Sequence, residues 1–409
     1  MKINIWARLF IAVVLLVTMT ACIQSPATTP TTTQSINADS NQQMLDDALE
    51  KILETQNVPA VAGAIISKGQ IIAADAVGVR KFGDPTPVTV DDQFVIGSCT
   101  KAFTATMIAM LVEQGKLTWD TTMAEVFPEL QYQMLPKYRT VTIIQLLSHH
   151  AGIQGNNVAD TPPGVPMDYW FHLTEPIMQQ RYIYMKAFLC QADTAAVQAL
   201  PAPGTRYLYS NVGYCIAAAV AERITRQSWE DLVTSMIFQP LGMTTAGFGF
   251  PGTGYEVDQP WQHAYADQYE NTQLVAYPQE VIRNTYPAVE NPAGFIYLSV
   301  KDWAKFAIQH LEGEKGGSTL LKPETFKISH TPPFGEKFGY ALGWDTSYVS
   351  QYGRPLDYIG TTGTNFSLIW LLPDSDFGIL LTTNTVSFDA SSEMYTSILD
   401  LFSKFLPQK

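Results

Sequence analysis

The 409-residue chain is poor in charged residues, and among these it is poorer in basic than in acidic ones. Only 15% of its residues are charged, and 25 Lys and Arg stand against 38 Asp and Glu, a formal net charge of -13. A chain with this balance and without an apparent basic patch is not expected to bind nucleic acid. Hydrophobic residues make up 46% of the chain, enough for a globular protein with a substantial core.

The apolar run near the N-terminus is too short to span a bilayer. It extends from Leu9 to Val17, follows Lys2 and Arg8, and leads to Ala21-Cys22, which is the order of an export signal. This segment resembles a bacterial lipoprotein signal, which implies cleavage before Cys22 and acyl chains on that thiol. An ordinary signal peptide or a membrane anchor is the alternative interpretation.

The residues that follow lack apolar periodicity. Residues 23–43 are rich in Pro, Thr, Ser, Gln and Asn, which is typical of a flexible tether. We predict a signal peptide over residues 1–21, a lipidated tether over 22–43 and one folded domain over 44–409. Ile23 stands where an Asp would indicate inner-membrane retention in a Gram-negative cell. The predicted location is therefore the cell envelope, on the periplasmic side of the bacterial outer membrane, with membrane contact through the lipid anchor.

Cysteine is scarce, with four residues in the whole chain. If Cys22 carries lipid, Cys99, Cys190 and Cys215 remain, and an odd number argues against a disulfide framework. We expect at most one bridge and favour three buried thiols.

The sequence also lacks the Gly-x-Ser-x-Gly stretch of a common class of Ser-His-Asp hydrolases, and its six His residues are not near a plausible nucleophile turn. His149 and His150 are adjacent, but no further ligands follow them at metal spacing. We expect no metal and no organic cofactor. For His149 we favour a structural role, as a helix cap or a buried hydrogen-bond partner.

Hydrophobic periodicity predicts an α+β fold in which strands lie near both ends of the chain and helices lie between them. One sheet is therefore expected to draw on both ends, with a largely helical inserted region over about residues 117–286. The predicted outer elements are a helix over 44–55, strands over 61–66, 71–79, 340–344, 366–372 and 377–382, and helices over 300–311 and 391–405.

The first motif with chemical meaning is Gly97-Ser98-Cys99-Thr100-Lys101, at the start of a predicted buried helix that ends before Gly115. Lys101 comes one helical turn after Ser98 and shares its face. A Ser hydroxyl becomes a nucleophile when a base removes its proton, and Lys serves as that base if burial keeps it neutral. The helix start also offers the backbone N–H of Ser98 as half of an oxyanion hole.

The second motif is a turn, Pro203 to Asn211, that carries Tyr209 and Asn211. A Tyr beside a Lys can pass a proton to a leaving group, and the Asn amide can bind a substrate carbonyl or orient the Lys. Tyr269 and Asn271 have the same spacing, so spacing alone does not choose between the two pairs.

The third motif, Gly360-Thr361-Thr362-Gly363-Thr364, directly precedes the predicted strand 366–372. Glycine at these positions lets a substrate backbone approach the edge of a strand closely.

In this order, the three motifs resemble those of the serine β-lactamase and penicillin-binding family, which includes class C β-lactamases, D-Ala-D-Ala carboxypeptidases and related esterases. Three further family-like stretches are 146–153, 239–243 and 292–295. The resemblance covers about residues 44–406 and favours Tyr209 over Tyr269, because the stretch 203–214 matches at length. It implies a β-lactamase/transpeptidase-like fold, with an antiparallel sheet flanked by helices and the site where the sheet meets the helical region.

The resemblance also implies a role for each motif residue. Ser98 would be acylated, Lys101 and Tyr209 would share the acid and base roles, and Asn211 would hold substrate. The backbone N–H groups of Ser98 and Thr364 would form the oxyanion hole. Thr361, Thr362 and Gly363 would line the substrate site along the strand edge. Which of Lys101 and Tyr209 takes the first proton stays open.

Thr361 departs from the family pattern, since it stands where the family usually has Lys or His. A cation there recognises a substrate carboxylate and tunes the neighbouring phenol. We therefore expect weak β-lactamase activity and favour a substrate without a carboxylate at that point, such as an ester or a neutral amide, unless Arg354 supplies the charge.

The function expected from the sequence is that of a serine hydrolase acting on a small-molecule or peptide substrate through an acyl-enzyme at Ser98. A D-Ala-D-Ala carboxypeptidase, an esterase and a β-lactamase all fit this expectation. The alternative is a catalytically weak or inactive penicillin-binding-like lipoprotein that acts as a binding module. The sequence does not indicate an oligomeric state.

Overall fold

The structure is a computed structural model that describes residues 38–155, 161–166, 168–266, 273–336, 339–346, 353, 355–386 and 388–406. Cys22, with the predicted signal peptide and most of the predicted tether, lies outside these residues, as do Tyr269 and Arg354. Residues 38–409 cluster as one unit.

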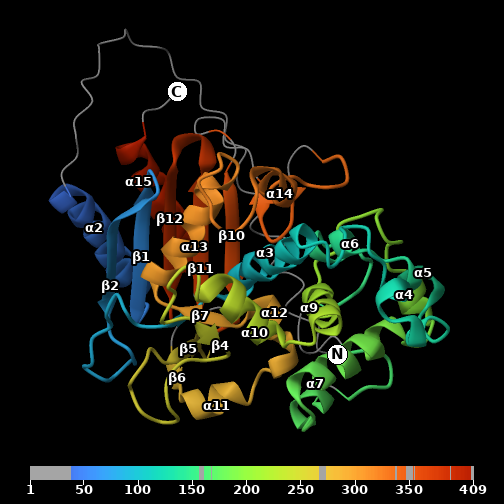
Figure 1. The fold of residues 1–409 in the computed structure, drawn as a ribbon. Helices are drawn as coiled ribbons and strands as arrows, with labels where there is room; N and C mark the ends of the chain where they lie inside the picture. Colours follow the sequence, from blue (N-terminus) through green and yellow to red (C-terminus); the bar gives the residue numbers. More distant parts are fainter. Residues whose placement is uncertain are drawn as a thin grey trace. The chain divides into compact units, whose positions relative to one another are not determined.

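A seven-stranded antiparallel sheet joins the two ends of this unit, in the strand order β2-β1-β12-β11-β10-β9-β8 (Figure 1). Ala64 of β1 lies opposite Leu380 of β12, which confirms that one sheet draws on both ends of the chain. The strands are β1 (Ala60–Ser67), β2 (Gln70–Gly78), β8 (Gly339–Tyr340), β9 (Asp345–Thr346), β10 (Leu356–Thr361), β11 (Phe366–Leu372) and β12 (Phe377–Thr383).

The two faces of the sheet bury different sets of side chains, because successive residues of a strand point to opposite faces. Val61 and Ile65 of β1 pack with the helices α2 (Ala38–Gln56) and α15 (Phe388–Phe405). Ala62 and Ala64 belong to the larger core on the other face, which α13 (Val300–Gly313) covers. The predicted α+β fold, an antiparallel sheet flanked by helices, is confirmed.

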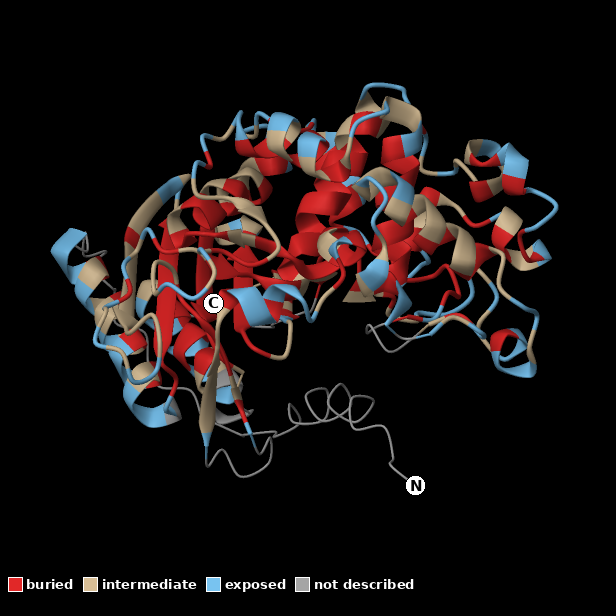
Figure 2. Cartoon of the chain, turned by 90° about the horizontal axis from the view of Figure 1, so that it is seen from below, coloured by how far each residue is buried: buried red, intermediate tan, exposed pale blue. Residues whose placement is uncertain are grey.

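The helical region lies beside the sheet (Figure 1) and packs around α3 (Thr100–Glu113) and α9 (Asn211–Thr225), most of whose residues are buried. Figure 2 shows that buried residues run through the interior of the unit, while exposed ones lie at its surface. The other helices from this region to α14 are α4 (Met123–Val126), α5 (Pro136–Arg139), α6 (Ile143–Leu147), α7 (Ile177–Leu189), α8 (Ala195–Gln198), α10 (Trp229–Val233), α11 (Gln279–Arg283), α12 (Asn291–Gly294) and α14 (Pro323–Ser329). The shorter helical turns are η1 (Gly97–Cys99), η2 (Pro128–Leu130), η3 (Tyr169–His172), η4 (Thr234–Phe238), η5 (Ala288–Glu290) and η6 (Pro373–Ser375).

Several element boundaries differ from the sequence prediction. Helix α2 begins at Ala38 and not at 44, because Gln42 and Gln43 hydrogen-bond to Asp46 and Asp47 one turn later and extend the helix. The predicted strand 340–344 is wrong, since residues 341–344 form the turn that joins β8 to β9.

The predicted helical region also contains strands. The region is helical up to η4, but the part beyond it includes the short strands β4 (Gly247–Phe248), β5 (Gln262–Tyr265) and β6 (Leu274–Tyr277). β4 pairs with β7 (Ile296–Leu298), which also pairs with β3 (Phe94–Val95) just before the first motif.

Within the described residues, no helix has both the length and the apolar character needed to cross a membrane.

Candidate active site

Ser98 lies in the turn η1 between β3 and the buried helix α3. Gly97 has a φ of 55°, a conformation that glycine adopts without strain, and it turns the chain from the strand into the helix. The predicted helix start is thus a 3-10 turn that continues into α3, with Ser98 partly exposed at its N-terminal end. The neighbouring Cys99 is buried, and burial raises the pKa of its thiol, as expected of a packed cysteine.

Lys101 is completely buried one turn after Ser98. Its Nζ lies 3.1 Å from the Ser98 Oγ and donates to the Asn211 Oδ1 at 2.6 Å and the Ala293 carbonyl oxygen at 2.7 Å. A carbonyl oxygen can only accept, so two N–H groups of the amine are committed to these partners. The third tetrahedral position of the amine nitrogen faces the Ser98 hydroxyl.

Tyr209 and Asn211 flank Ser210, which is the N-cap of α9. The Ser210 Oγ accepts a hydrogen bond from the Gly213 N–H at 3.1 Å, which fixes the start of the helix. The Tyr209 hydroxyl consequently lies 2.7 Å from the Ser98 Oγ, while Asn211 reaches Lys101. The Lys101 Nζ also lies 4.8 Å from the centre of the Tyr209 ring.

His149 contacts the backbone and the ring of the segment Tyr209–Asn211. Its Nδ1 accepts the Ser210 backbone N–H at 3.1 Å, and its ring lies 4.4 Å from the Tyr209 ring, centre to centre. Burial lowers the pKa of His149 well below its usual value, and the neighbouring Lys101 amine adds to this effect, so the ring is neutral at pH 7. The predicted role of His149 as a buried hydrogen-bond partner is confirmed.

The third motif meets the turn η1 through its glycine. A Cβ atom at Gly360 would lie 2.0 Å from the Ile96 carbonyl oxygen and 2.9 Å from the Ser98 nitrogen. The end of β10 can therefore rest against the backbone of η1 only because residue 360 has no side chain.

The loop after β10 is held by polar groups of its own and by two side chains from other segments. The exposed Thr361 accepts the Gly363 N–H at 3.0 Å, and Asn365 accepts the Thr362 N–H at 3.0 Å. The Thr364 hydroxyl donates to the Gln262 Oε1 at 3.1 Å. The Tyr286 hydroxyl donates a hydrogen bond to the Thr362 carbonyl oxygen. Burial raises the pKa of Tyr286 to about 12, so the phenol stays protonated and can make this bond.

The structure thus brings Ser98, Lys101, Tyr209 and Asn211 into direct contact, and it packs the Gly360–Thr364 segment against the same turn. The sequence analysis missed the Ala293 carbonyl as a partner of Lys101. A backbone oxygen carries no signal in residue type, although the stretch around it had been noted as family-like.

The described cysteines, Cys99, Cys190 and Cys215, are free thiols, and Cys190 is only partly buried. In the part of the chain that the structure describes, no three His, Cys, Asp or Glu side chains gather as a metal site.

Residues 45–401 match the Beta-lactamase family. Penicillin-binding protein 4 of Amycolatopsis lactamdurans is 27% identical over 358 residues, which cover 84% of this chain and 85% of that protein. Protein flp of Staphylococcus aureus (strain NCTC 8325 / PS 47) is 23% identical over 350 residues, and the chain spans only 63% of its length while 84% of this chain is covered.

Among solved structures, the D-amino acid amidase from Ochrobactrum anthropi SV3 complexed with L-phenylalanine aligns with a TM-score of 0.66 at 20% identity. The alignment covers 90% of this chain and 99% of that chain, which confirms the predicted β-lactamase/transpeptidase-like fold. Since the family match extends over most of the sequence, the chain belongs to the Beta-lactamase family.

Proposed function

We propose that this protein is a serine hydrolase that cleaves an amide or ester through a covalent acyl-enzyme at Ser98. The observation that carries the proposal is the position of the Ser98 Oγ, 3.1 Å from the Lys101 Nζ and 2.7 Å from the Tyr209 hydroxyl. Both distances lie within the reach that proton transfer requires. The names of the relatives, which include a penicillin-binding protein and an amidase, agree with acyl transfer.

In the acylation step, the Ser98 proton passes to Lys101 or Tyr209 while the Oγ attacks the substrate carbonyl carbon. A neutral Lys101 would present its lone pair to the Ser98 hydroxyl, because its two N–H groups are committed to Asn211 and Ala293. The backbone N–H groups of Ser98 and Thr364 would stabilise the oxyanion. The leaving group departs with the proton, and the acyl group stays on Ser98.

In the deacylation step, water attacks the acyl carbon and gives one proton to Lys101 or Tyr209. The same group passes this proton to the Ser98 Oγ as the acid departs. Asn211 contributes by holding Lys101, since its Oδ1 accepts from the amine at 2.6 Å. A role of its amide in holding substrate is part of the same proposal.

We propose that the substrate is neutral where it meets Thr361. The hydroxyl of Thr361 already accepts the Gly363 N–H, so toward substrate it offers a donor without a positive charge. A carboxylate there would lack the charge-assisted bond that a Lys provides. Thr362 and Gly363 would line the same edge of the substrate site.

The test is the intact mass of the full-length protein after exposure to a penicillin and, separately, to an activated ester. An ester adduct on the wild type that Ser98→Ala lacks is expected, with slower formation of the penicillin adduct. Absence of any adduct or hydrolysis with either reagent would favour the alternative, a lipoprotein that binds without turnover.

We also propose that Cys22 carries the lipid that anchors the protein on the periplasmic side of the outer membrane. The order of charges, apolar run and cysteine supports this proposal. The expected result is a mature protein that begins at an acylated Cys22 and fractionates with the outer membrane. A mature N-terminus at another residue would contradict the proposal.

A further inference from the structure

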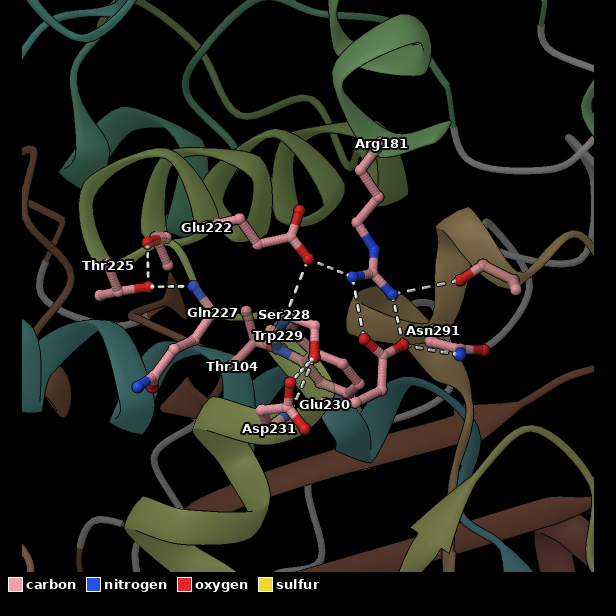
Figure 3. Close-up of polar contacts among 12 residues, drawn as sticks. Thr104, Arg181, Glu222, Thr225, Gln227, Ser228, Trp229, Glu230, Asp231 and Asn291 are labelled. Atoms are coloured by element: carbon pink, nitrogen blue, oxygen red, sulfur yellow. Dashed lines mark hydrogen bonds and ion pairs between the residues drawn. The ribbon is translucent and has the colours of Figure 1, made fainter. Parts of the chain in front are cut away.

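A cluster of charged side chains lies outside the proposed site, where three helices meet, and two of its three members are buried while Glu230 is partly exposed. Arg181 of α7 is fully buried and forms ion pairs with Glu222 of α9 and Glu230 of α10 (Figure 3). We call these three residues the Arg181 cluster. Burial raises the pKa of Glu222, and the Arg181 guanidinium opposes this effect.

The Arg181 cluster is not explained by stability alone. Taking paired charges out of water costs about as much as their attraction returns, and apolar replacements of buried ion pairs are often neutral or stabilising. Such a cluster does fix the geometry of its surroundings, because each charged group needs a full set of directed partners. The partners of the Arg181 cluster therefore indicate what it positions.

Two of these partners belong to the segment that contains η5 and α12. The Arg181 guanidinium donates to the Ala288 carbonyl oxygen at 3.4 Å, and the Asn291 side-chain amide donates to the Glu230 Oε1 at 3.0 Å. Figure 3 shows Asn291 beside Glu230 and the guanidinium between the two carboxylates. The cluster thus holds one side of this segment.

Helix α3 holds the other side of the same segment. The Thr104 hydroxyl donates to the Pro292 carbonyl oxygen at 2.7 Å, and the Lys101 Nζ donates to the Ala293 carbonyl oxygen at 2.7 Å. Trp229 adds a second connection, since its backbone N–H donates to Glu222 at 2.9 Å and its indole N–H donates to the Thr104 hydroxyl at 3.1 Å.

We propose that the Arg181 cluster is a positioning element that holds α12 and, through the Ala293 carbonyl, keeps the Lys101 amine against Ser98. The proposal rests on the function proposed above, because it assigns a task to Lys101. Asn291, which bonds to Glu230, lies only two residues before Ala293, whose carbonyl oxygen accepts from the amine. A displacement of α12 therefore changes the direction in which the amine meets the Ser98 hydroxyl, and a misplacement of 1 Å can lower a rate by about a hundredfold.

The test exchanges the two ends of the Asn291–Glu230 hydrogen bond in the full-length protein. Glu230→Gln removes the charge that pairs with Arg181, and the nitrogen of the new amide must face either the guanidinium or the Asn291 amide. Asn291→Asp sets a carboxylate against Glu230. Each single variant should lower the rate of acylation by an activated ester about 10- to 100-fold. The double variant restores a donor opposite a carboxylate with the same net charge, but it leaves Arg181 facing an amide at position 230. We therefore expect its rate to recover in part, to at least about threefold above that of the slower single variant. Asn291→Ala serves if a charged variant does not fold.

The second readout does not depend on activity. In protein labelled with carbon-13 at the lysine Cε, the Lys101 resonance, assigned by its loss in Lys101→Arg, should move in each single variant and move back toward its wild-type position in the double variant. If the wild type forms no acyl-enzyme, the function proposal fails, and this resonance still tests the positioning.

Val233→Ala is the matched control, since Val233 is fully buried on the same helix as Glu230 but makes no polar contact. It should lower the melting temperature without changing the acylation rate or the Lys101 resonance. Single variants that change neither readout would overturn the proposal. Equal losses of rate in Val233→Ala and in Glu230→Gln at matched melting temperatures would also overturn it, since they would mark a general structural effect.

Discussion

The contact between Gly360 and the turn η1, which contains Ser98, gives a prediction whose size follows from the structure. In Gly360→Ala, the new Cβ would lie 2.0 Å from the Ile96 carbonyl oxygen, whereas Cβ contacts under 3.0 Å essentially never occur. The two backbone segments must therefore separate by at least about 1 Å, the difference between these two distances. Since a 1 Å misplacement can cost about a hundredfold, we expect acylation of Ser98 to slow by about that factor, or about 2.7 kcal/mol.

The assay is the rate at which an activated ester acylates the full-length protein, measured with the melting temperature of each variant. Gly378→Ala is the control, because it also adds a Cβ inside the same sheet, 2.6 Å from the end of the Leu371 side chain. Neither glycine has a left-handed backbone, and the Leu371 side chain can move where the backbone carbonyl of Ile96 cannot. Both variants should lose stability, by about 1–3 kcal/mol, but only Gly360→Ala should lose acylation. A wild-type acylation rate in Gly360→Ala would refute the reasoning.

Three further predictions concern single residues. Lys101→Met should lower the acylation rate by about 10²–10⁴-fold with little loss of thermal stability, and a wild-type rate would remove Lys101 from the mechanism. Thr361→Lys should raise the rate of acylation by a penicillin, relative to the rate with a neutral ester, by about tenfold, because the new Lys can form a charge-assisted bond to the penicillin carboxylate. An unchanged ratio of the two rates would contradict the substrate proposal. Burial lowers the pKa of His263 from 6.5 to about 4. As the pH falls from 6.5 to 4, His263 therefore becomes protonated in the unfolded chain but stays neutral in the folded protein, which favours unfolding. The free energy of unfolding should drop by about 3 kcal/mol over this range through His263, and a His263→Gln variant with the same pH dependence in denaturant unfolding would contradict this.

Much of the fold was predictable because its pattern is local. The runs that form β1, β2, β11 and β12 are short, apolar and bounded by turn residues, and their boundaries agree with the structure to within about two residues. The sequence analysis did not predict strand β10, because Pro355 and Gly360 are residue types that are rare in strands. The strand forms because β11 supplies its hydrogen bonds. The region after η4 was predicted to be helical, but its two- to four-residue strands depend on partners elsewhere, such as Tyr297 opposite Gly247.

The geometry of the candidate site was predictable where its residues share a helix turn or a motif. Ser98 and Lys101 are one turn apart, so helical geometry alone brings them together. The choice of Tyr209 over Tyr269 rested on the family resemblance, and Tyr269 lies outside the described residues. The Ala293 carbonyl and the Arg181 cluster come from distant segments whose residue types point to no chemistry, so only the folded arrangement reveals them.

The central claim is that Ser98 is the nucleophile of an acyl-enzyme supported by Lys101 and Tyr209. The most direct test is the intact mass of wild type and Ser98→Ala after exposure to an activated ester, followed by peptide mapping of any adduct. The account predicts one acyl group on the peptide that contains Ser98 in the wild type and none in Ser98→Ala. An adduct that persists in Ser98→Ala, or a wild type that hydrolyses the ester with its acyl group on another residue, would contradict it.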